Sequence, residues 1–163
     1  MTEAENKALV LRYFGGEMEI IDEDCRFFLS GHMPCSGWMT KREKEALSGS
    51  IMETVGRWTT TIGDMVAEGD RVWVEWESNA NLTNGKRYNN FYVYMFKFLD
   101  GKIVELKLFV DSLHMYRVLD APQVRGEPRD RQSPLTHVTE RFEFADSSWR
   151  KLLERQSSER SRE

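Results

Sequence analysis

His32 is the residue best suited to acid–base chemistry, because the pKa of a histidine side chain lies near neutral pH. It stands in the stretch His32-Met33-Pro34, within a loop expected between Gly31 and Gly37. As a general base it would face a bound substrate. The alternative is a loop histidine that hydrogen-bonds to the backbone, and the residues alone leave both interpretations open.

Cys25, His32 and Cys35 are of the types that bind metal ions. A structural zinc site needs a fourth ligand and a closed geometry, and the spacing of the two cysteines matches no zinc or redox motif. We therefore predict two reduced thiols and no metal site.

The composition is that of an ordinary soluble globular domain. Of the 163 residues, 40% are hydrophobic and 31% are charged. The net charge of −4 argues against nucleic acid as a partner. Lys97 and Asp100 interrupt the longest apolar stretch, which argues against a membrane span, and the polar N-terminus does not resemble a secretory signal. A cytoplasmic location is predicted. No phosphate-binding glycine loop is present, so no cofactor is expected.

Two turn dipeptides organise a three-stranded meander from Arg71 to Asp111. Asn84-Gly85 and Asp100-Gly101 each suit a two-residue type I′ turn. Side chains of a strand alternate between faces, so counting outward from these turns assigns each residue to a face. The predicted inner face is almost purely apolar and consists of Val72, Val74, Trp76, Ser78, Ala80, Phe91, Val93, Met95, Val104, Leu106, Leu108 and Val110. A β-bulge would exchange the faces beyond it.

Helices are expected on either side of a short strand at residues 25–30. Thr2-x-x-Glu5 and Thr40-x-x-Glu43 are capping boxes. A strand over 57–67 and a short helix over 112–119 complete a domain of residues 1–120. Residues 121–163 form an extension with a linker at 121–135, an added edge strand at 136–144 and a last helix after Asp146.

The order of these elements and several short stretches resemble the NTF2-like superfamily, in particular its SnoaL-like and ketosteroid-isomerase-related branch. The stretches are Ser36-Gly37, Glu68-Gly69-Asp70-Arg71-Val72, Asn84-Gly85-Lys86, Tyr88-x-Asn90-x-Tyr92, Asp100-Gly101-Lys102-Ile103 and Val110-Asp111. The resemblance implies an α+β cone, in which a curved antiparallel sheet wraps around N-terminal helices. It also implies an apolar pocket for a small hydrophobic molecule and pairing of subunits through the sheet.

The branch includes isomerases, polyketide cyclases and epoxide hydrolases that work by acid–base chemistry in this pocket. In the isomerase, apolar surroundings shift the pKa values of carboxyl groups, so that these groups can act as a base or as a proton donor. The resemblance places an oxyanion-binding tyrosine at Tyr13 and a water-positioning loop at His32-Met33-Pro34. Asp111, which ends the last motif, is a third catalytic candidate. Strand alternation turns it away from the pocket, where it would cap the following helix, whereas a β-bulge would turn it inward as a catalytic carboxylate.

The sequence also departs from the family pattern. Leu108 stands where the cyclases and hydrolases place a carboxylate, and Val93 stands near the cyclase histidine. Trp76 and Ser78 replace a hydrolase Arg and Asp. Because these side chains cannot transfer protons as those groups do, we assign them, with Trp38 and Phe91, to substrate binding. The alternative for the tryptophans and Tyr13 is a place in the core.

Three functions remain open. The first is a cofactor-independent isomerase, cyclase, dehydratase or hydrolase for a polycyclic, terpenoid or polyketide-like compound. In this enzyme His32 would transfer a proton, and Tyr13 or Ser78 would stabilise the charge that develops on the substrate oxygen. The second is a protein that binds such a ligand without chemistry. The third is a dimeric interaction module. We favour the enzyme.

Overall fold

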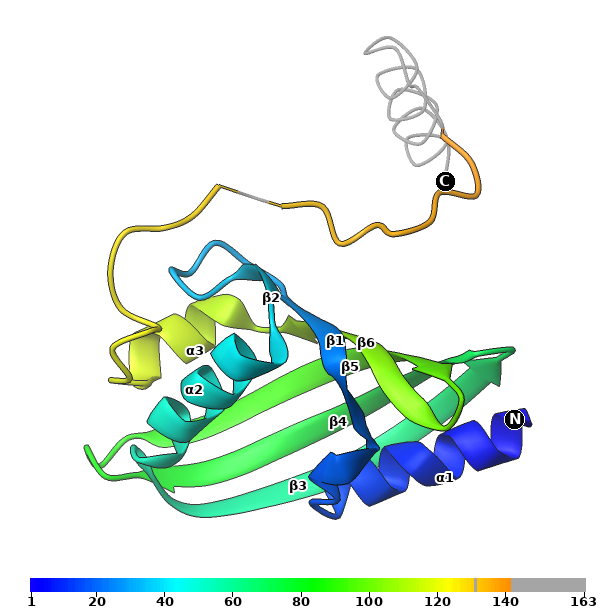
Figure 1. The fold of residues 1–163 in the computed structure, drawn as a ribbon. Coiled ribbons are helices and arrows are strands. Elements are labelled where there is room, and N and C mark those ends of the chain that lie inside the picture. Colours follow the sequence, from blue (N-terminus) through cyan, green and yellow to red (C-terminus); the bar gives the residue numbers. More distant parts are fainter. Residues whose placement is uncertain (131, 142–163) are drawn as a thin grey trace, which may run out of the picture.

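The computed structural model describes residues 1–130 and 132–141. The described residues form, in order, α1 (Glu3–Phe14), the short 3-10 helix η1 (Met18–Ile20), β1 (Ile21–Leu29), β2 (Gly37–Met39), α2 (Lys41–Met52), β3 (Val55–Glu68), β4 (Arg71–Leu82), β5 (Arg87–Leu99), β6 (Lys102–Val110) and α3 (Ser112–Val118). The predicted α+β class is confirmed (Figure 1).

The strands make one sheet in the order β2-β1-β6-β5-β4-β3. β1 runs parallel to β6, and every other neighbouring pair is antiparallel. α1 packs against β3 and β4, α2 against β1 and β2, and α3 against β5. The core therefore lies between the helices and the inner face of the sheet (Figure 1).

Both N-terminal helices begin where the capping boxes predict. The hydroxyl of Thr2 accepts from the backbone N–H of Glu5, and the Glu5 carboxylate accepts from the Thr2 N–H at 2.7 Å. Thr40 and Glu43 make the same reciprocal pair at the start of α2. These bonds satisfy backbone donors that a helix leaves unpaired at its first turn.

The first hairpin has a three-residue loop, not the two-residue turn predicted from Asn84-Gly85. The N–H of Leu82 donates to the carbonyl of Lys86 at 2.9 Å, which leaves Thr83, Asn84 and Gly85 in the loop. A type I′ turn needs positive φ at both central residues. Gly85 has φ of 81°, but Asn84 is not in the positive region.

This single extra residue exchanges the faces of β5. The predicted inward orientation of Phe91, Val93 and Met95 is wrong, and these side chains point to the outer face. The inward side chains of β5 are those of Tyr88, Asn90, Tyr92, Tyr94 and Phe96, all of them buried.

The second hairpin is the predicted two-residue turn. Asp100 and Gly101 have φ of 48° and 77°, and Leu99 pairs with Lys102. A bulge follows near Val104, where the pairing of β5 with β6 shifts by one residue. This shift cancels the error in the first hairpin, so Leu106, Leu108 and Val110 share the face of Tyr92 and Tyr94, as predicted. The inward orientation predicted for Val104 is wrong, because Ile103 before the bulge is the residue that lies in the core.

The chain remains packed in the core for several residues after α3. Ala121 and Val124 are fully buried in the core, so core packing continues past the predicted boundary at residue 120. Residues 136–140 contain no strand. Residues 142–144 of the predicted edge strand and the helix predicted after Asp146 lie outside the described residues.

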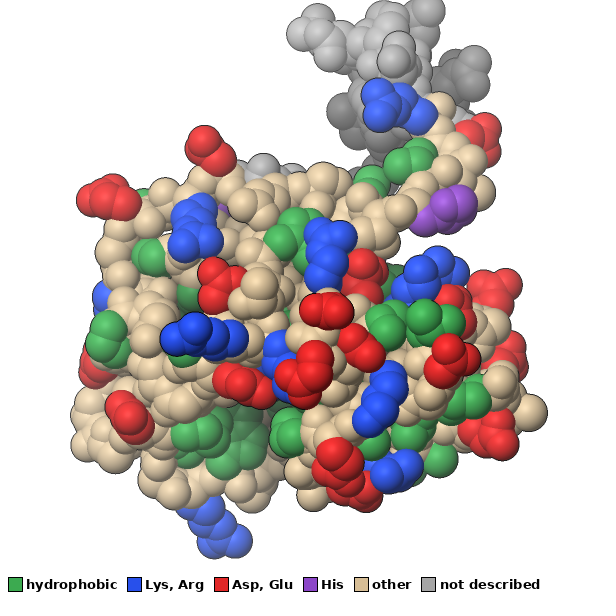
Figure 2. Space-filling model, viewed as in Figure 1, with side chains coloured by type: hydrophobic (Ala, Val, Ile, Leu, Met, Phe, Trp, Pro, Cys, Tyr) green, Lys and Arg blue, Asp and Glu red, His purple; other side chains and the backbone are tan. Residues whose placement is uncertain are grey.

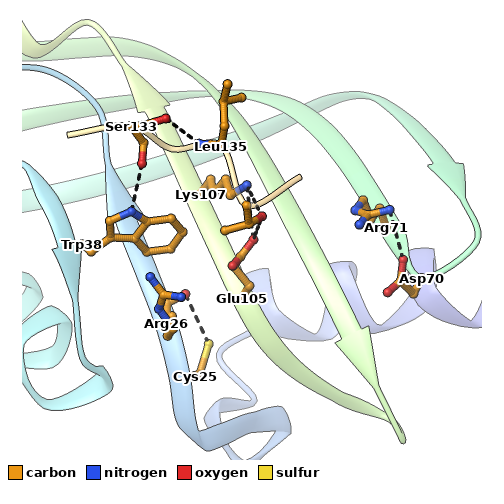
Figure 3. Close-up of polar contacts among 10 residues, drawn as sticks. Cys25, Arg26, Trp38, Asp70, Arg71, Glu105, Lys107, Ser133 and Leu135 are labelled. Atoms are coloured by element: carbon orange, nitrogen blue, oxygen red, sulfur yellow. Dashed lines mark hydrogen bonds and ion pairs between the residues drawn. The ribbon is translucent and has the colours of Figure 1, made fainter. Parts of the chain in front are cut away.

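Residues 132–136 of the extension cross the outer side of β2, β1 and β6 (Figures 1 and 3). The indole N–H of Trp38 donates to the carbonyl of Ser133 at 3.0 Å. Thr136 bridges the ion pair between Glu105 and Lys107, whose charged atoms are 3.3 Å apart. Both side chains of the pair are about one-tenth exposed, so the extension shields an ion pair that would otherwise face water.

Candidate functional site: an inner cavity with a hydroxyl chain

A cavity of about 170 Å³ lies between the inner face of the sheet and the helices. Apolar or hydroxyl-bearing side chains make up its wall, apart from one lysine: Tyr13, Leu29, Met39, Lys44, Leu47, Ser48, Ile51, Met52, Trp58, Trp76, Tyr88, Tyr92, Tyr94, Leu108, Val110 and Met115. Figure 2 shows hydrophobic side chains gathered between α2 and the end of α1, with charged side chains around them. An apolar wall with a few placed polar groups is typical of a small-molecule site.

A chain of buried hydroxyl groups follows β4 and β5 behind this wall. Ser78 donates to the Tyr92 hydroxyl at 3.2 Å, and the hydroxyls of Tyr92 and Tyr88 are 2.6 Å apart. The Asn90 amide donates to the Tyr88 hydroxyl at 2.9 Å and to the carbonyl of Asp111 at 3.1 Å. The chain is thus fixed at one end by the backbone where β6 ends.

Counting donors and acceptors leaves one proton of the tyrosine pair free. Each hydroxyl accepts one bond from outside the pair, from Ser78 or from Asn90. The pair owns two O–H protons, and the bond between the hydroxyls uses one. Whichever way that bond runs, the other proton has no acceptor among the described residues and is available to a ligand.

Burial raises the pKa of the three cavity tyrosines that β5 contributes, Tyr88, Tyr92 and Tyr94. Desolvation raises the pKa of Tyr92 to about 12, opposed by the hydrogen bonds from Ser78 and Tyr88. The pKa of Tyr88 is raised further, and that of Tyr94 is also raised, in both cases chiefly by burial. All three are therefore neutral proton donors at physiological pH. Of Tyr88 and Tyr92, Tyr92 is the more acidic, because its hydrogen bonds to Ser78 and Tyr88 oppose the effect of burial.

Trp76 forms the side of the cavity next to Tyr92. The two rings stack with centroids 3.8 Å apart and planes 6° apart, and the Tyr94 ring meets Trp76 edge-on at 5.0 Å. The indole nitrogen of Trp76 is buried and has no hydrogen-bond partner among the described residues. A buried donor without a partner is costly, so this N–H is a second group that a ligand could satisfy.

Lys44 is the one cavity-lining side chain in the described chain that carries a charge at neutral pH. Its ammonium group lies over the rings of Tyr13 and Phe27, with nitrogen-to-centroid distances of 5.8 Å and 5.6 Å. Both distances are within the range of a cation–π interaction. Among the described residues no carboxylate lies within ion-pair distance of it.

His32 does not line this cavity. It is exposed in the loop before β2, where its ring Nδ1 lies 3.2 Å from the carbonyl of Arg129. The N–H of Arg129 in turn donates to the carbonyl of His32 at 3.0 Å. The structure therefore shows the backbone-bonded loop histidine, one of the two interpretations left open by the sequence.

Asp111 is the N-cap of α3. Its carboxylate accepts from the N–H of His114 at 3.0 Å and is absent from the cavity wall. Asp111 contributes to the site through its backbone. Its carbonyl accepts from the Asn90 amide nitrogen, and its N–H donates to the Asn90 amide oxygen. This is the capping arrangement expected from strand alternation.

The structure divides the remaining predicted site residues into two groups. Tyr13, Trp76 and Leu108 line the cavity, and Ser78 lies behind Tyr92. Phe91 and Val93 are on the outer face because of the three-residue loop. Trp38 is also outside the cavity, between the extension and the guanidinium of Arg26, 4.2 Å from its ring centroid (Figure 3).

Sequence reasoning missed Tyr88, Tyr92 and Tyr94 as site residues, because the assumed turn placed them outside. The alternation Tyr88-x-Asn90-x-Tyr92-x-Tyr94 carried the signal. Lys44 was missed because a lone lysine on a helix is usually solvated.

The two cysteines are unpaired, and the described residues contain no group of three His, Cys, Asp or Glu side chains arranged for a metal. Burial raises the pKa of Cys25 to about 12 and that of Cys35 to about 11. Both are therefore thiols at neutral pH and poor nucleophiles. In the described chain no helix is long and apolar enough to cross a membrane.

The sequence profile of the SnoaL-like domain matches residues 14–106, more than half of the chain. The chain belongs to the SnoaL-like domain family. This confirms the resemblance drawn from the sequence motifs. No protein with curated annotation matches the sequence.

Solved structures of SnoaL-like and NTF2-like proteins share the fold. A candidate SnoaL-like polyketide cyclase from Jannaschia sp. CCS1 has a TM-score of 0.60 and 21% identity, over 74% of this chain and 94% of that one. An NTF2-like protein from Burkholderia xenovorans LB400 has a TM-score of 0.60 and 19% identity, over 74% and 99%. IdmH of Streptomyces antibioticus, a candidate polyketide cyclase, has a TM-score of 0.58 and 18% identity, over 72% of this chain and 97% of that one. These likenesses confirm the NTF2-like fold.

Proposed function

We propose that this SnoaL-like protein is an enzyme that enolises an apolar carbonyl compound in the inner cavity, as isomerases and cyclases do. The observation that carries the proposal is the free proton of the Tyr88–Tyr92 pair inside an apolar wall. A fixed O–H donor in a site of low dielectric constant stabilises negative charge developing on a carbonyl oxygen.

In this reaction a proton leaves the carbon next to the carbonyl, and its electron pair moves to the carbonyl oxygen. The Tyr92 hydroxyl donates to that oxygen, and a later proton transfer to carbon completes an isomerisation. No carboxylate or imidazole lines the cavity in the described chain, so we assign the first proton to hydroxide or a buffer base. His32, predicted as the base, is given no such role.

The volume of the cavity favours a compact substrate. An apolar cavity of ~150 Å³ holds benzene, and this one has about 170 Å³. We therefore propose that one or two fused rings occupy the cavity. The larger polycyclic compounds expected from the sequence would have to extend beyond it.

The two-ring ketone 2-tetralone is a suitable probe. In D₂O its α-protons exchange for deuterium by enolisation, and proton NMR follows the loss of signal. We expect the protein to accelerate exchange beyond the rate in buffer. The second candidate function, binding without chemistry, is favoured by the lack of a base on the cavity wall. It predicts saturable binding of 2-tetralone with no acceleration.

We also propose that two copies pair through the outer face of the sheet. Phe91 is 64% exposed, and Trp73 and Val93 are each 40% exposed on this face. Phe91 and Val93 line an open hollow of about 510 Å³, and Trp73 stacks on Phe109, which also lines it. Clustered exposed apolar side chains on one face are typical of an interaction surface.

Phe91→Glu is expected to convert this dimer to a monomer, because a charge would be buried at its centre. Light scattering should give twice the mass of one chain for the wild-type protein and the mass of one chain for the variant. Leu113→Glu, which changes an exposed side chain of α3, should remain dimeric. A wild-type monomer at the same concentration would refute the pairing.

A further inference from the structure

We propose that the ligand of the inner cavity is an organic anion, a compact apolar ring system with a carboxylate or phenolate group, and that Lys44 is its counter-ion. The inference rests on the proposed function, because it assigns a ligand class to the same cavity. It goes beyond that function because an enolisable carbonyl need not carry a charge.

Lys44 lies at the cavity with no anionic partner among residues 1–130 and 132–141. The faces of the Tyr13 and Phe27 rings fix its ammonium group on the wall. The neighbouring Lys41 on the same helix, by contrast, pairs with Glu23 at 2.7 Å. A ring face stabilises an ammonium group less than a charge-assisted hydrogen bond to an oxyanion does. An anionic ligand would supply the stronger partner.

Two further polar groups of the wall also lack acceptors among the described residues. One proton of the Tyr88–Tyr92 pair is free, and the indole N–H of Trp76 has no partner in the described chain. Together with Lys44 these two groups make three donors without an acceptor, and no carboxylate of the described residues lines the cavity. A ligand rich in acceptor oxygens would satisfy them, whereas a hydrocarbon would leave buried donors unpaired.

The donors are spread along the cavity, so one ligand can use two of them at once. Lys44 adjoins Tyr13, whose ring packs against Phe96 with centroids 5.2 Å apart. Tyr92 precedes Phe96 by four residues on β5, so the Cα atoms of the two residues are roughly 13 Å apart along the strand. We place the anionic group at Lys44 and a second oxygen, such as the reacting carbonyl, at Tyr92.

The test compares 2-naphthoate with 2-naphthamide, which have nearly the same shape and differ in charge. Binding to the full chain is measured by titration calorimetry at pH 7.5. We expect the wild-type protein to bind 2-naphthoate at least tenfold more tightly, the range of one hydrogen bond to a charged group. Lys44→Gln should remove this preference, because it should weaken binding of 2-naphthoate far more than binding of 2-naphthamide, and Lys44→Arg should retain it.

Arg42→Gln is the matched control, because it removes one positive charge from the exposed side of the same helix. It should keep the full preference for 2-naphthoate. If wild-type and Lys44→Gln proteins bind both compounds equally, the ligand class is wrong while the cavity remains a binding site. If the wild-type protein binds neither compound, the proposed function fails, and this inference fails with it.

Discussion

Replacing Tyr92 with phenylalanine is expected to slow the protein-dependent deuterium exchange of 2-tetralone about 100-fold, the usual cost of removing an oxyanion donor. The substitution removes one oxygen and keeps the ring that stacks on Trp76, so the cavity wall should keep its shape. The loss should appear at saturating probe, because the hydrogen bond strengthens as charge develops on the carbonyl oxygen. NMR measurement of the exchange rate checks this result.

Tyr88→Phe provides the comparison. It leaves Tyr92 with its own proton and the bond from Ser78 but removes one bond that makes Tyr92 more acidic. A loss of less than about tenfold is expected, the usual range for one neutral hydrogen bond. Equal rates for the wild-type and Tyr92→Phe proteins, with unchanged thermal unfolding, would rule out Tyr92 as the oxyanion donor.

The second large effect is a loss of stability in alkaline solution. Buried Tyr88, Tyr92 and Tyr94 have pKa values above the ordinary 10.0. Cys25 and Cys35 titrate above the ordinary 9.0. Above pH 9 these groups lose protons in the unfolded chain but keep them in the folded protein. The free energy of unfolding therefore falls as pH rises. Each group contributes about 1.4 kcal/mol per pH unit between its pKa in the unfolded chain and its pKa in the folded protein.

This contribution is fully present below pH 9 and is lost as pH rises toward the folded-state pKa values, about 12 for Tyr92. Guanidinium unfolding at pH 8, 10 and 11 measures it. Tyr94→Phe keeps the buried ring but removes one titrating hydroxyl, so its stability should fall less steeply above pH 10, by about 1.4 kcal/mol per pH unit. Identical slopes for the two proteins, or no fall by pH 11, would contradict the burial of these hydroxyls.

Local chemistry in the sequence was enough to predict the starts of α1 and α2 and the connection between β5 and β6. The capping boxes at Thr2 and Thr40 act over three residues, and Asp100-Gly101 adopts the backbone that its turn type requires. Such signals depend on neighbouring residues only, so they survive folding unchanged.

The orientation of β5 could not be predicted because it depends on a difference of one loop residue. Asn84-Gly85 is compatible with both a two-residue and a three-residue loop, and each places a different side of β5 inside. With the three-residue loop, the inward side chains of β5 include Tyr88, Tyr92 and Tyr94. With a two-residue loop they would include Phe91 and Val93. Both sets are rich in aromatic or aliphatic side chains, so hydrophobicity did not decide between them.

The site itself depends on contacts between distant segments. Lys44 meets Tyr13 and Phe27 only after α2 has packed against β1. His32 meets the backbone of Arg129, which is 97 residues away in the sequence. Neither contact has a local sequence signature, and residue type alone favoured the histidine over the tyrosines.

The most direct test of the inner cavity as the ligand site is methyl NMR of protein labelled with ¹³C at its methionine methyl groups. Met39, Met52 and Met115 line the cavity, whereas Met95 points to the outer face of β5. Addition of 2-tetralone should shift the methyl signals of Met39, Met52 and Met115 through the ring current of the ligand and leave that of Met95 in place. Saturable binding that shifts Met95, or none of the three cavity methionines, would contradict the account.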